Sequence, residues 1–195
     1  MSDYTVFYDV GESLKQLLAE ELSPLVELKN IKFDSPAHIK ENASLPCLSL
    51  FLFKVEENAH LKNSDMHHIN PPEPHKPPIA MDLYYLITPF SKEKDDELRI
   101  AGRVVQIFHD YPVLRGRMLK KSLDGASEKF RMVLYSLPFD ELFQLWQSFK
   151  EESFGLSLCY KVTPVEIDSR RELQLPQRVV EKQDEYYQKS VKKVK

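Results

Sequence analysis

The sequence has few glycines and none of the short motifs that mark common catalytic or nucleotide-binding sites. Five glycines stand against thirteen prolines, which argues against glycine-rich phosphate loops and favours rigid connections between elements. The P-loop, the dinucleotide-binding G-x-G-x-x-G pattern, the G-x-S-x-G nucleophile elbow and the H-E-x-x-H zinc motif are all absent. We therefore expect a protein that is not an enzyme, with no catalytic residues and no cofactor.

Long apolar runs and a secretory start are missing as well. No stretch approaches the roughly 20 apolar residues that a membrane-spanning helix needs. Residues 1–12 lack the basic start and apolar centre of a signal peptide. Only two cysteines occur, Cys47 and Cys159, and their apolar surroundings indicate buried free thiols in a reducing compartment. We expect no direct membrane insertion, and a cytoplasmic chain that later joins a larger particle.

Charge of one sign is not in excess either. The net charge is −3 with both signs well mixed, so the composition gives no support for a nucleic-acid partner. The 42% hydrophobic and 29% charged residues are sufficient for a soluble domain with a core of its own. At 195 residues the chain fits one domain, predicted over residues 1–170, followed by a polar basic extension over 171–195.

The most strongly patterned stretch runs from Ile79 to Leu114. An apolar strand is predicted over Met81–Ile87, ending at Thr88-Pro89. An acidic start then leads into a helix that ends before Pro112, where proline cannot donate a backbone hydrogen bond. The apolar positions assigned to the buried side of this helix are Leu98, Ala101, Val104, Val105 and Phe108.

The first third of the chain predicts a helix, a strand and a surface loop. Residues 3–22 have the spacing of an amphipathic helix, and residues 25–33 suit one strand or a small hairpin. Residues 37–45 are interpreted as a polar surface loop. The strand expected over Pro46–Val55 is apolar on both faces, which predicts a central strand covered on both sides, with Leu48, Leu50, Leu52 and then Lys54 on one face.

The last third predicts two short strands, a helix and a final strand. The short strands are expected over residues 115–121 and 128–135, and the helix over 138–150. Pro164 within the final strand, 156–167, predicts an edge position or a bulge. Together these elements indicate an α+β fold with a mixed, mainly antiparallel sheet covered by two or three amphipathic helices. The inward stripe of the helix consists of Leu142, Leu145, Trp146 and Phe149.

Several residues are of types found at chemical sites, but their patterns do not predict one. The histidines near the proline-rich stretch, His67 and His68 among them, lack a cysteine pair or regular ligand spacing, so no metal site is predicted. His109 and Asp110 are sequence neighbours that point to different sides of a helix. The acidic residues 95–97 suit a helix N-terminus. The aromatic residues Tyr84, Tyr85, Tyr160 and Trp146 are interpreted as core instead of a base-stacking platform.

Two segments are instead predicted to bind other proteins. Residues 63–78 contain five prolines and no glycine, a composition typical of extended loops that engage a partner. Residues 176–195 hold six basic and three acidic side chains, too polar for the core and suited to a protein partner. The candidate interface residues are Asn63, His67, His68, Pro72, Pro78, Arg178, Lys182, Tyr186, Tyr187, Lys192 and Lys193.

Four segments, taken in order, resemble one protein family. They are SLFLFKVEENAHLKN at 49–63, MDLYYLITPFS at 81–91, GRVVQIFHDYPVL at 102–114, and the pair ELFQLWQSF and LSLCYKVTPVEID within 141–168. This order, with a Glu-Asn-x-x-Leu-x-Asn element before a proline-rich loop, resembles the tail-cap (tube-terminator) family of extracellular contractile injection systems, including those of virulence-cassette and antifeeding-prophage particles. The resemblance covers roughly residues 3–168.

The resemblance implies an architectural role. It implies a fold related to phage tail terminators and a homohexameric ring on the distal end of the inner tube, which stops tube growth and holds the last sheath layer. The partners implied are a second copy of the chain, the inner tube protein and the sheath protein. No catalytic residues are carried over. An alternative is a baseplate-associated or transient assembly factor of a phage-tail-like particle.

Overall fold

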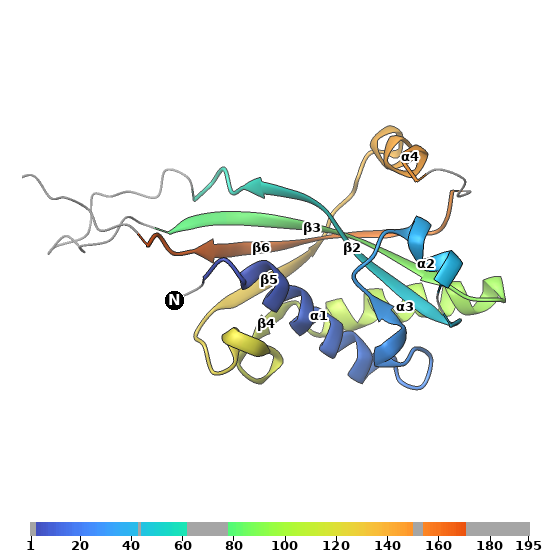
Figure 1. Ribbon diagram of the computed structural model, residues 1–195, viewed down its shortest axis with the longest axis horizontal. Helices are drawn as coiled ribbons and strands as arrows, with labels where there is room; N and C mark the ends of the chain where they lie inside the picture. The colour runs from blue at the N-terminus through green and yellow to red at the C-terminus, as the bar shows by residue number, and fades with distance from the viewer. Residues whose placement is uncertain (1–2, 43, 62–77, 150–153, 171–195) are drawn as a thin grey trace, which may run out of the picture.

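Three long antiparallel strands form the middle of the protein. The computed structural model describes residues 3–42, 44–61, 78–149 and 154–170, and its sheet has the strand order β1-β2-β3-β6-β5-β4 (Figure 1). Only β1 and β2 pair in parallel, so the predicted mixed, mainly antiparallel sheet is confirmed. The strands are β1 (Ile31–Lys32), β2 (Cys47–Glu57), β3 (Ile79–Phe90), β4 (Val113–Arg115), β5 (Lys129–Leu134) and β6 (Leu158–Ile167).

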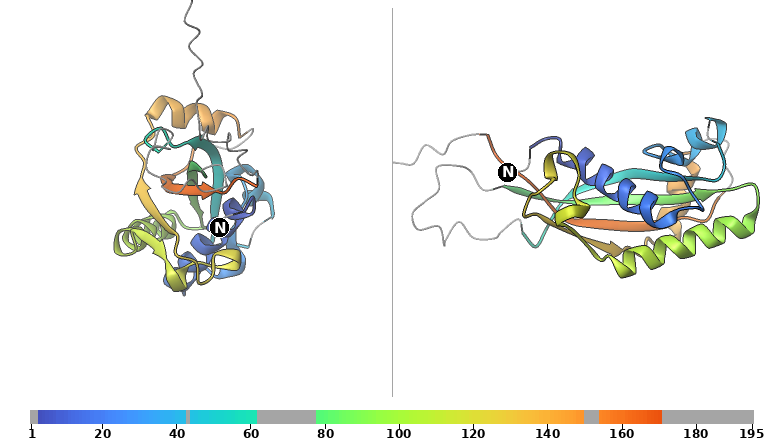
Figure 2. Two further views of the ribbon diagram at one scale, coloured as in Figure 1. Left: turned by 90° about the vertical axis from the view of Figure 1, so that its left-hand side faces the viewer. Right: turned by 90° about the horizontal axis from the view of Figure 1, so that it is seen from below.

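Helices cover the two faces of this sheet unequally. Helices α1 (Val6–Leu22) and α3 (Lys94–Asp110) lie on one face, and α4 (Phe139–Gln147) lies on the other (Figures 1 and 2). A short helix, α2 (Pro36–Asn42), precedes β2. The α+β class and the covering helices predicted from the sequence are therefore confirmed.

The main core lies between the sheet and the pair α1 and α3. The apolar stripe predicted for residues 3–22 faces the sheet, with Val10, Leu14 and Leu18 almost fully buried. Leu83, Tyr85 and Ile87 of β3 contribute to the same core, at the two-residue spacing of one strand face. Because a buried leucine contributes roughly 1.5–3 kcal/mol, this layer holds most of the apolar stabilisation of the fold.

The buried face of α3 agrees with the predicted one in part. Leu98 is 62% exposed and Val105 is also exposed, whereas Ile100 and Ile107 are buried. The helix is turned slightly from the predicted stripe, because the contacts with α1 and β3 determine which apolar residues are covered. The predicted positions that are buried are Ala101, Val104 and Phe108. Glu97 is buried in the first turn, where its carboxylate accepts hydrogen bonds from Lys94 Nζ at 2.8 Å and the Ser91 backbone N–H at 3.3 Å.

The opposite face carries a smaller aromatic core under α4. Trp146 and Phe149 pack against Leu86 of β3, and Phe51 meets the Phe149 ring edge-on at 5.8 Å. Leu142 and Leu145 complete the inward stripe predicted for this helix, which is therefore confirmed. The four aromatic residues interpreted as core, Tyr84, Tyr85, Tyr160 and Trp146, are all buried.

Buried polar contacts join α1 to the irregular stretch after β4. Ser13 Oγ accepts a hydrogen bond from the Lys120 backbone N–H at 3.0 Å and donates one to the Asp9 carbonyl at 2.7 Å. The Asp9 carboxylate accepts hydrogen bonds from Thr5 and Ser122. These contacts hold residues 116–123 as two 3₁₀ turns, and the strand predicted over 115–121 is wrong. Of the predicted strand only Arg115 is extended, as the last residue of β4. The extended backbone stops there because Gly116 adopts a positive φ of 55°.

Two expectations for residues 25–45 are also wrong. Residues 28–30 form a 3₁₀ turn before the two-residue β1, so neither a full strand nor a hairpin forms there. The expected loop over 37–45 contains α2 instead. Asp34-Ser35-Pro36 starts this helix, because proline suits the first helical position and the Asp34 carboxylate accepts the Ser35 backbone N–H at 2.8 Å.

Prolines within strands mark the places where pairing is incomplete. β3 continues past its predicted end at Thr88-Pro89 to Phe90, because β6 no longer pairs with it beyond Ile87 and a residue without N–H is tolerated there. Pro164 does not put β6 at an edge, since β6 lies between β3 and β5. The other expectation is confirmed, because Thr163 and Pro164 form a bulge opposite Asp82.

β2 is covered on both faces, as its apolar pattern predicted, but it is not a fully central strand. Leu48 and Leu50 belong to the main core, and Phe51 packs against the smaller one. Only Leu48 and Ser49 pair with β1, so from Leu50 onward no described strand pairs with β2 on that side. A second bulge, at Phe53, moves Lys54 away from the face of Leu48, Leu50 and Leu52. The Lys54 ammonium instead lies 5.0 Å from the centre of the Tyr84 ring.

Exchanging two apolar residues of α3 tests its orientation. We expect Ile100→Ala, at a site 1% exposed, to lower the free energy of unfolding by roughly 2–5 kcal/mol because it leaves a cavity. The control Leu98→Ala, at an exposed site, should change it by about 0.5 kcal/mol or less. Urea denaturation measures both values, and a larger loss for Leu98→Ala would contradict the orientation.

Candidate interaction surfaces

A cluster of polar side chains lies at one end of the sheet, where β2 ends and β3 begins. Asp82 of β3 accepts hydrogen bonds from Asn58 Nδ2 at 2.8 Å, from Lys161 Nζ at 3.2 Å and from the Thr163 hydroxyl. Asn58 Nδ2 also donates to Thr163 Oγ1 at 3.1 Å. We call Asn58, Asp82, Lys161 and Thr163 the strand-end cluster. It ties β2, β3 and β6 together at the bulge.

The charge of Asp82 is stabilised within this cluster. Burial by itself would raise the pKa of Asp82, but the hydrogen bonds from Thr163, Asn58 and Lys161, with the positive charge of Lys161, outweigh it and lower the pKa below its ordinary value. The carboxylate is therefore ionised at neutral pH, and it is 7% exposed. The buried carboxylate and its partners therefore stabilise the strand pairing at this end of the sheet. Removing one of them would leave the others without hydrogen-bond partners.

The Glu-Asn-x-x-Leu-x-Asn element gains a physical explanation from Asn58. Its Oδ1 accepts the backbone N–H groups of His60 and Leu61, each at 3.0 Å, while its amide reaches the strand-end cluster. The side chain therefore ends β2 and turns the chain away from the sheet. The sequence analysis singled out this element but did not predict Asp82 and Thr163 as the partners of Asn58. An acidic residue inside the apolar strand MDLYYLI was the available signal.

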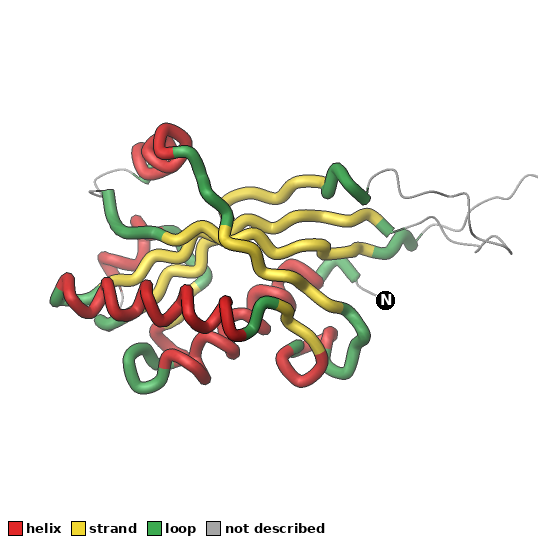
Figure 3. The backbone as a smooth tube through the Cα atoms, turned by 180° about the vertical axis from the view of Figure 1, so that it is seen from behind, coloured by secondary structure: helices red, strands yellow, loops and turns green. Residues whose placement is uncertain are grey.

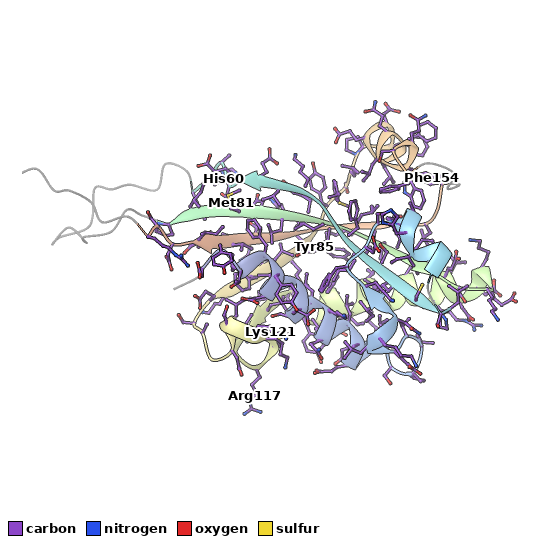
Figure 4. The ribbon with its side chains drawn as sticks, viewed as in Figure 1. His60, Met81, Tyr85, Arg117, Lys121 and Phe154 are labelled. Carbon is purple, nitrogen blue, oxygen red and sulfur yellow. The ribbon has the colours of Figure 1, made fainter. Side chains whose placement is uncertain are left out.

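The predicted interface segments leave the sheet at this same end. Pro78 is exposed, and the other candidate interface residues, Asn63, His67, His68, Pro72, Arg178, Lys182, Tyr186, Tyr187, Lys192 and Lys193, lie outside the described residues. Ile79 pairs with Ile167, and the Asn58 backbone N–H donates to the Ala80 carbonyl at 2.9 Å. The structure thus brings together the described strand ends Ile79 and Ile167, which precede or follow these segments in the chain. Figure 4 shows His60 and Met81 at this end, away from Phe154.

An aromatic patch lies on α4 and the segment after it. Phe139, Phe143 and Phe154 are 68%, 43% and 48% exposed. The Phe139 ring stacks on Phe143 at 6.2 Å and lies 5.9 Å from Phe154, whose ring is 5.7 Å from the buried Trp146. Figure 3 shows α4 standing clear of the other helices. We call Phe139, Phe143 and Phe154 the aromatic patch. Exposed aromatic side chains in a group are typical of the centres of protein–protein interfaces.

An apolar groove of about 300 Å³ runs between α1 and β2. The exposed rings of Tyr8 and Phe33 meet edge-on at 6.5 Å on its rim, and the Lys15 ammonium lies 5.3 Å from the Phe33 ring centre. Gly11 allows the close approach, because a Cβ there would come within 3.1 Å of Phe33. We call this the α1–β2 groove. Its lining residues are Phe7, Tyr8, Gly11, Phe33, Leu50, Phe51, Leu52 and Tyr85.

The described residues contain little that resembles catalytic or metal chemistry. His109 and Asp110 are exposed at the end of α3, and no group of three potential metal ligands occurs within the described ranges. Cys47 and Cys159 are buried free thiols, as predicted, and burial raises their pKa values to about 11 and about 12. Among the helices of the described part, none is long and apolar enough to cross a membrane.

Comparison with known proteins places the chain in a family. Residues 9–181 match the model of the Pvc16 N-terminal domain, so the chain belongs to this family. The recognition made from the sequence is thereby confirmed. No curated protein sequence matches the chain significantly.

Two solved structures share the fold. One is the sheath/tube terminator of PVC, an extracellular contractile injection system, in its extended state, with 20% identity and a TM-score of 0.62 over 97% of this chain. The other is the tube-terminating cap of the anti-feeding prophage, with 18% identity and a TM-score of 0.61 over 92% of this chain. The chain spans 66% and 61% of the lengths of these two relatives.

Substitution of Asp82 tests the strand-end cluster. We expect Asp82→Ala to lower the free energy of unfolding by roughly 2–4 kcal/mol at neutral pH, because it removes the acceptor of Lys161 and of the Thr163 hydroxyl and one of the two acceptors of Asn58. The lowered pKa means that this stabilisation is present above the ordinary carboxyl pKa of about 4 and is lost as the pH falls through the lowered value.

Urea denaturation at several pH values measures the free energy of unfolding of the wild type, Asp82→Ala and a control variant. The control, Glu166→Ala, removes an exposed carboxylate from the neighbouring strand β6 and should cost about 0.5 kcal/mol or less. An Asp82→Ala cost that grew as the pH was lowered would contradict the assignment.

Proposed function

We propose that this chain is a structural cap that terminates the inner tube of a contractile injection particle. The observation that carries the proposal is the fold shared with a sheath/tube terminator and a tube-terminating cap over almost the whole of this chain, together with its membership of their domain family. The role is architectural and not enzymatic. The chain assembles in the cytoplasm and then becomes part of the particle.

A closed ring explains how such a protein stops a polymer. A growing tube presents the same unsatisfied surface at its end after each added layer. Subunits that join side by side through a heterologous contact form a ring when the rotation closes. A homohexameric ring that matches the tube on one side, and offers no further docking surface on the other, ends the growth. The partners are further copies of this chain, the tube protein and the sheath protein.

The exposed surfaces suit this division of contacts. The aromatic patch supplies rigid apolar anchors, the kind of side chain that carries most of the binding energy at interfaces. In this proposal residues 63–78 and 176–195 make contacts from one end of the protomer, which is supported by the pairing of Ile79 with Ile167 near the strand-end cluster. In this proposal residues 176–195 engage the sheath or an adjacent protomer. The final strand, for which the sequence predicted an edge position or a bulge, has the bulge and lies inside the sheet, so it does not offer an edge to a partner.

Removing the chain from producing cells tests the capping role. Without it, tube growth should not stop at the normal length, and electron micrographs of purified particles should show a broad length distribution or few sheathed particles. Normal sheathed particles of uniform length would overturn the proposal. Stable presence of the wild-type chain in purified particles separates a cap from a transient assembly factor, which would be absent.

A chain truncated after Leu175 tests the contact proposed for residues 176–195. In electron micrographs it should give tubes of normal length that retain the sheath poorly.

The aromatic patch can be tested with the whole chain present. We expect Phe139→Asp with Phe143→Asp to fold, because both side chains are exposed, and to reduce incorporation into particles by about tenfold or more, the effect of losing one hot-spot contact. The control Leu98→Asp places the same charge at another exposed apolar site, on α3. Mass spectrometry of purified particles measures incorporation. Equal incorporation of both variants would exclude the patch as a contact.

A further inference from the structure

The edge of β2 is open along most of the strand. Leu48 and Ser49 pair with β1, and the pairing on this side ends there among the described residues. From Leu50 to Glu56 the strand pairs with β3 only. About half of the backbone N–H and C=O groups in such a stretch point away from the sheet. An open edge of this length is a template for another strand, and native proteins usually cover it.

The α1–β2 groove lies directly beside this open edge. Leu50 and Leu52 of β2 line it from one side, and Tyr8 of α1 and Phe33 line it from the other. Tyr8 is 56% exposed and Phe33 is 41% exposed, unusually high for aromatic side chains that already contact one another. A strand added to the edge would place alternate side chains in this groove. The site therefore offers both main-chain hydrogen bonds and an apolar pocket, the two requirements for strand addition.

The described chain ends beside the residues that precede α1, about one helical turn before the groove. Arg170 forms a two-pronged ion pair with Asp3, at 2.8 and 2.7 Å, and its guanidinium lies 5.5 Å from the centre of the Tyr4 ring. Tyr4 precedes α1, and Tyr8 follows in its first turn on the groove rim. Such an exposed ion pair contributes little stability. It places the last described residue beside the start of α1. A residue three positions beyond Arg170 can reach roughly 10 Å further.

The sequence after Arg170 has the pattern that the groove requires. Residues 171–175 read RELQL, in which Leu173 and Leu175 alternate with the polar Glu172 and Gln174. In an extended strand both leucines lie on one face, and Pro176 then ends the run. We infer that residues 171–175 dock in the α1–β2 groove of the same chain as an added strand on the open edge of β2, with Leu173 and Leu175 in the groove.

Docking within one chain is favoured over docking onto a second copy. Arg170 is held by Asp3 of its own chain, so the segment starts at its own groove and loses little chain entropy on binding. The inference is independent of the capping role, because it concerns the isolated protein. It leaves residues 176–195 available for partners.

Amide hydrogen exchange of the purified full chain tests the inference. Amides of residues 50–56 that point away from β3 should exchange at least tenfold more slowly in the wild type than in Leu173→Asp with Leu175→Asp, since the variant cannot seat two carboxylates in an apolar groove. The control, Val191→Asp with Val194→Asp, adds the same charges further along the chain and should exchange like the wild type. Equal exchange in the wild type and the Leu173/Leu175 variant would overturn the inference.

A disulfide distinguishes the chain's own groove from that of a second copy. Tyr8→Cys with Leu173→Cys should form a bond on mild oxidation that keeps the mass of a monomer, because both native thiols are buried. The control, Leu98→Cys with Leu173→Cys, pairs the segment with an exposed site on α3 and should not form an internal bond. Disulfide-linked dimers, or no more internal bond than in the control, would contradict docking within one chain.

Discussion

The structure depends on β3 being buried on both faces along most of its length. Leu83, Tyr85 and Ile87 face the core beneath α1 and α3, whereas Leu86 faces the smaller core beneath α4. Its two neighbours, β2 and β6, pair with it along nearly its whole length. Because side chains alternate along a strand, a shift of one residue would exchange the two cores. This pairing therefore fixes the positions of all the other elements.

The polar residue in this strand limits the pairing at one end. Asp82 lies opposite the bulge in β6, and its ionised carboxylate accepts hydrogen bonds from two segments, from Asn58 after β2 and from Lys161 and Thr163 of β6. The bulge allows Pro164 to lie inside the sheet, and Asn58 ends β2 at the same level. The cluster thus defines the end of the sheet from which the segments predicted to bind partners begin. Rigid strands at that end provide a fixed base for them, whatever those segments contact.

Two apolar surfaces remain after the cores are filled. The aromatic patch stands on α4, which contacts the sheet through one face only, and the α1–β2 groove lies beside an edge that β1 leaves open. Both are larger than isolated exposed side chains would explain. The two surfaces have different proposed occupants, because the groove is assigned to residues 171–175 of the same chain and the aromatic patch to another subunit of the particle. Neither surface brings nucleophilic or metal-ligating groups together within the described residues.

The sequence by itself determined the elements with strong periodicity. These were α1, the three long strands and α4, because apolar spacing depends only on local geometry. The ordered set of segments also identified the family. Tertiary structure alone decided the buried side of α3, the central place of β6, the open edge of β2 and the partners of Asp82. Each of these depends on which distant residues, such as Asn58 and Thr163, lie against the segment, and local spacing carries no information about such contacts.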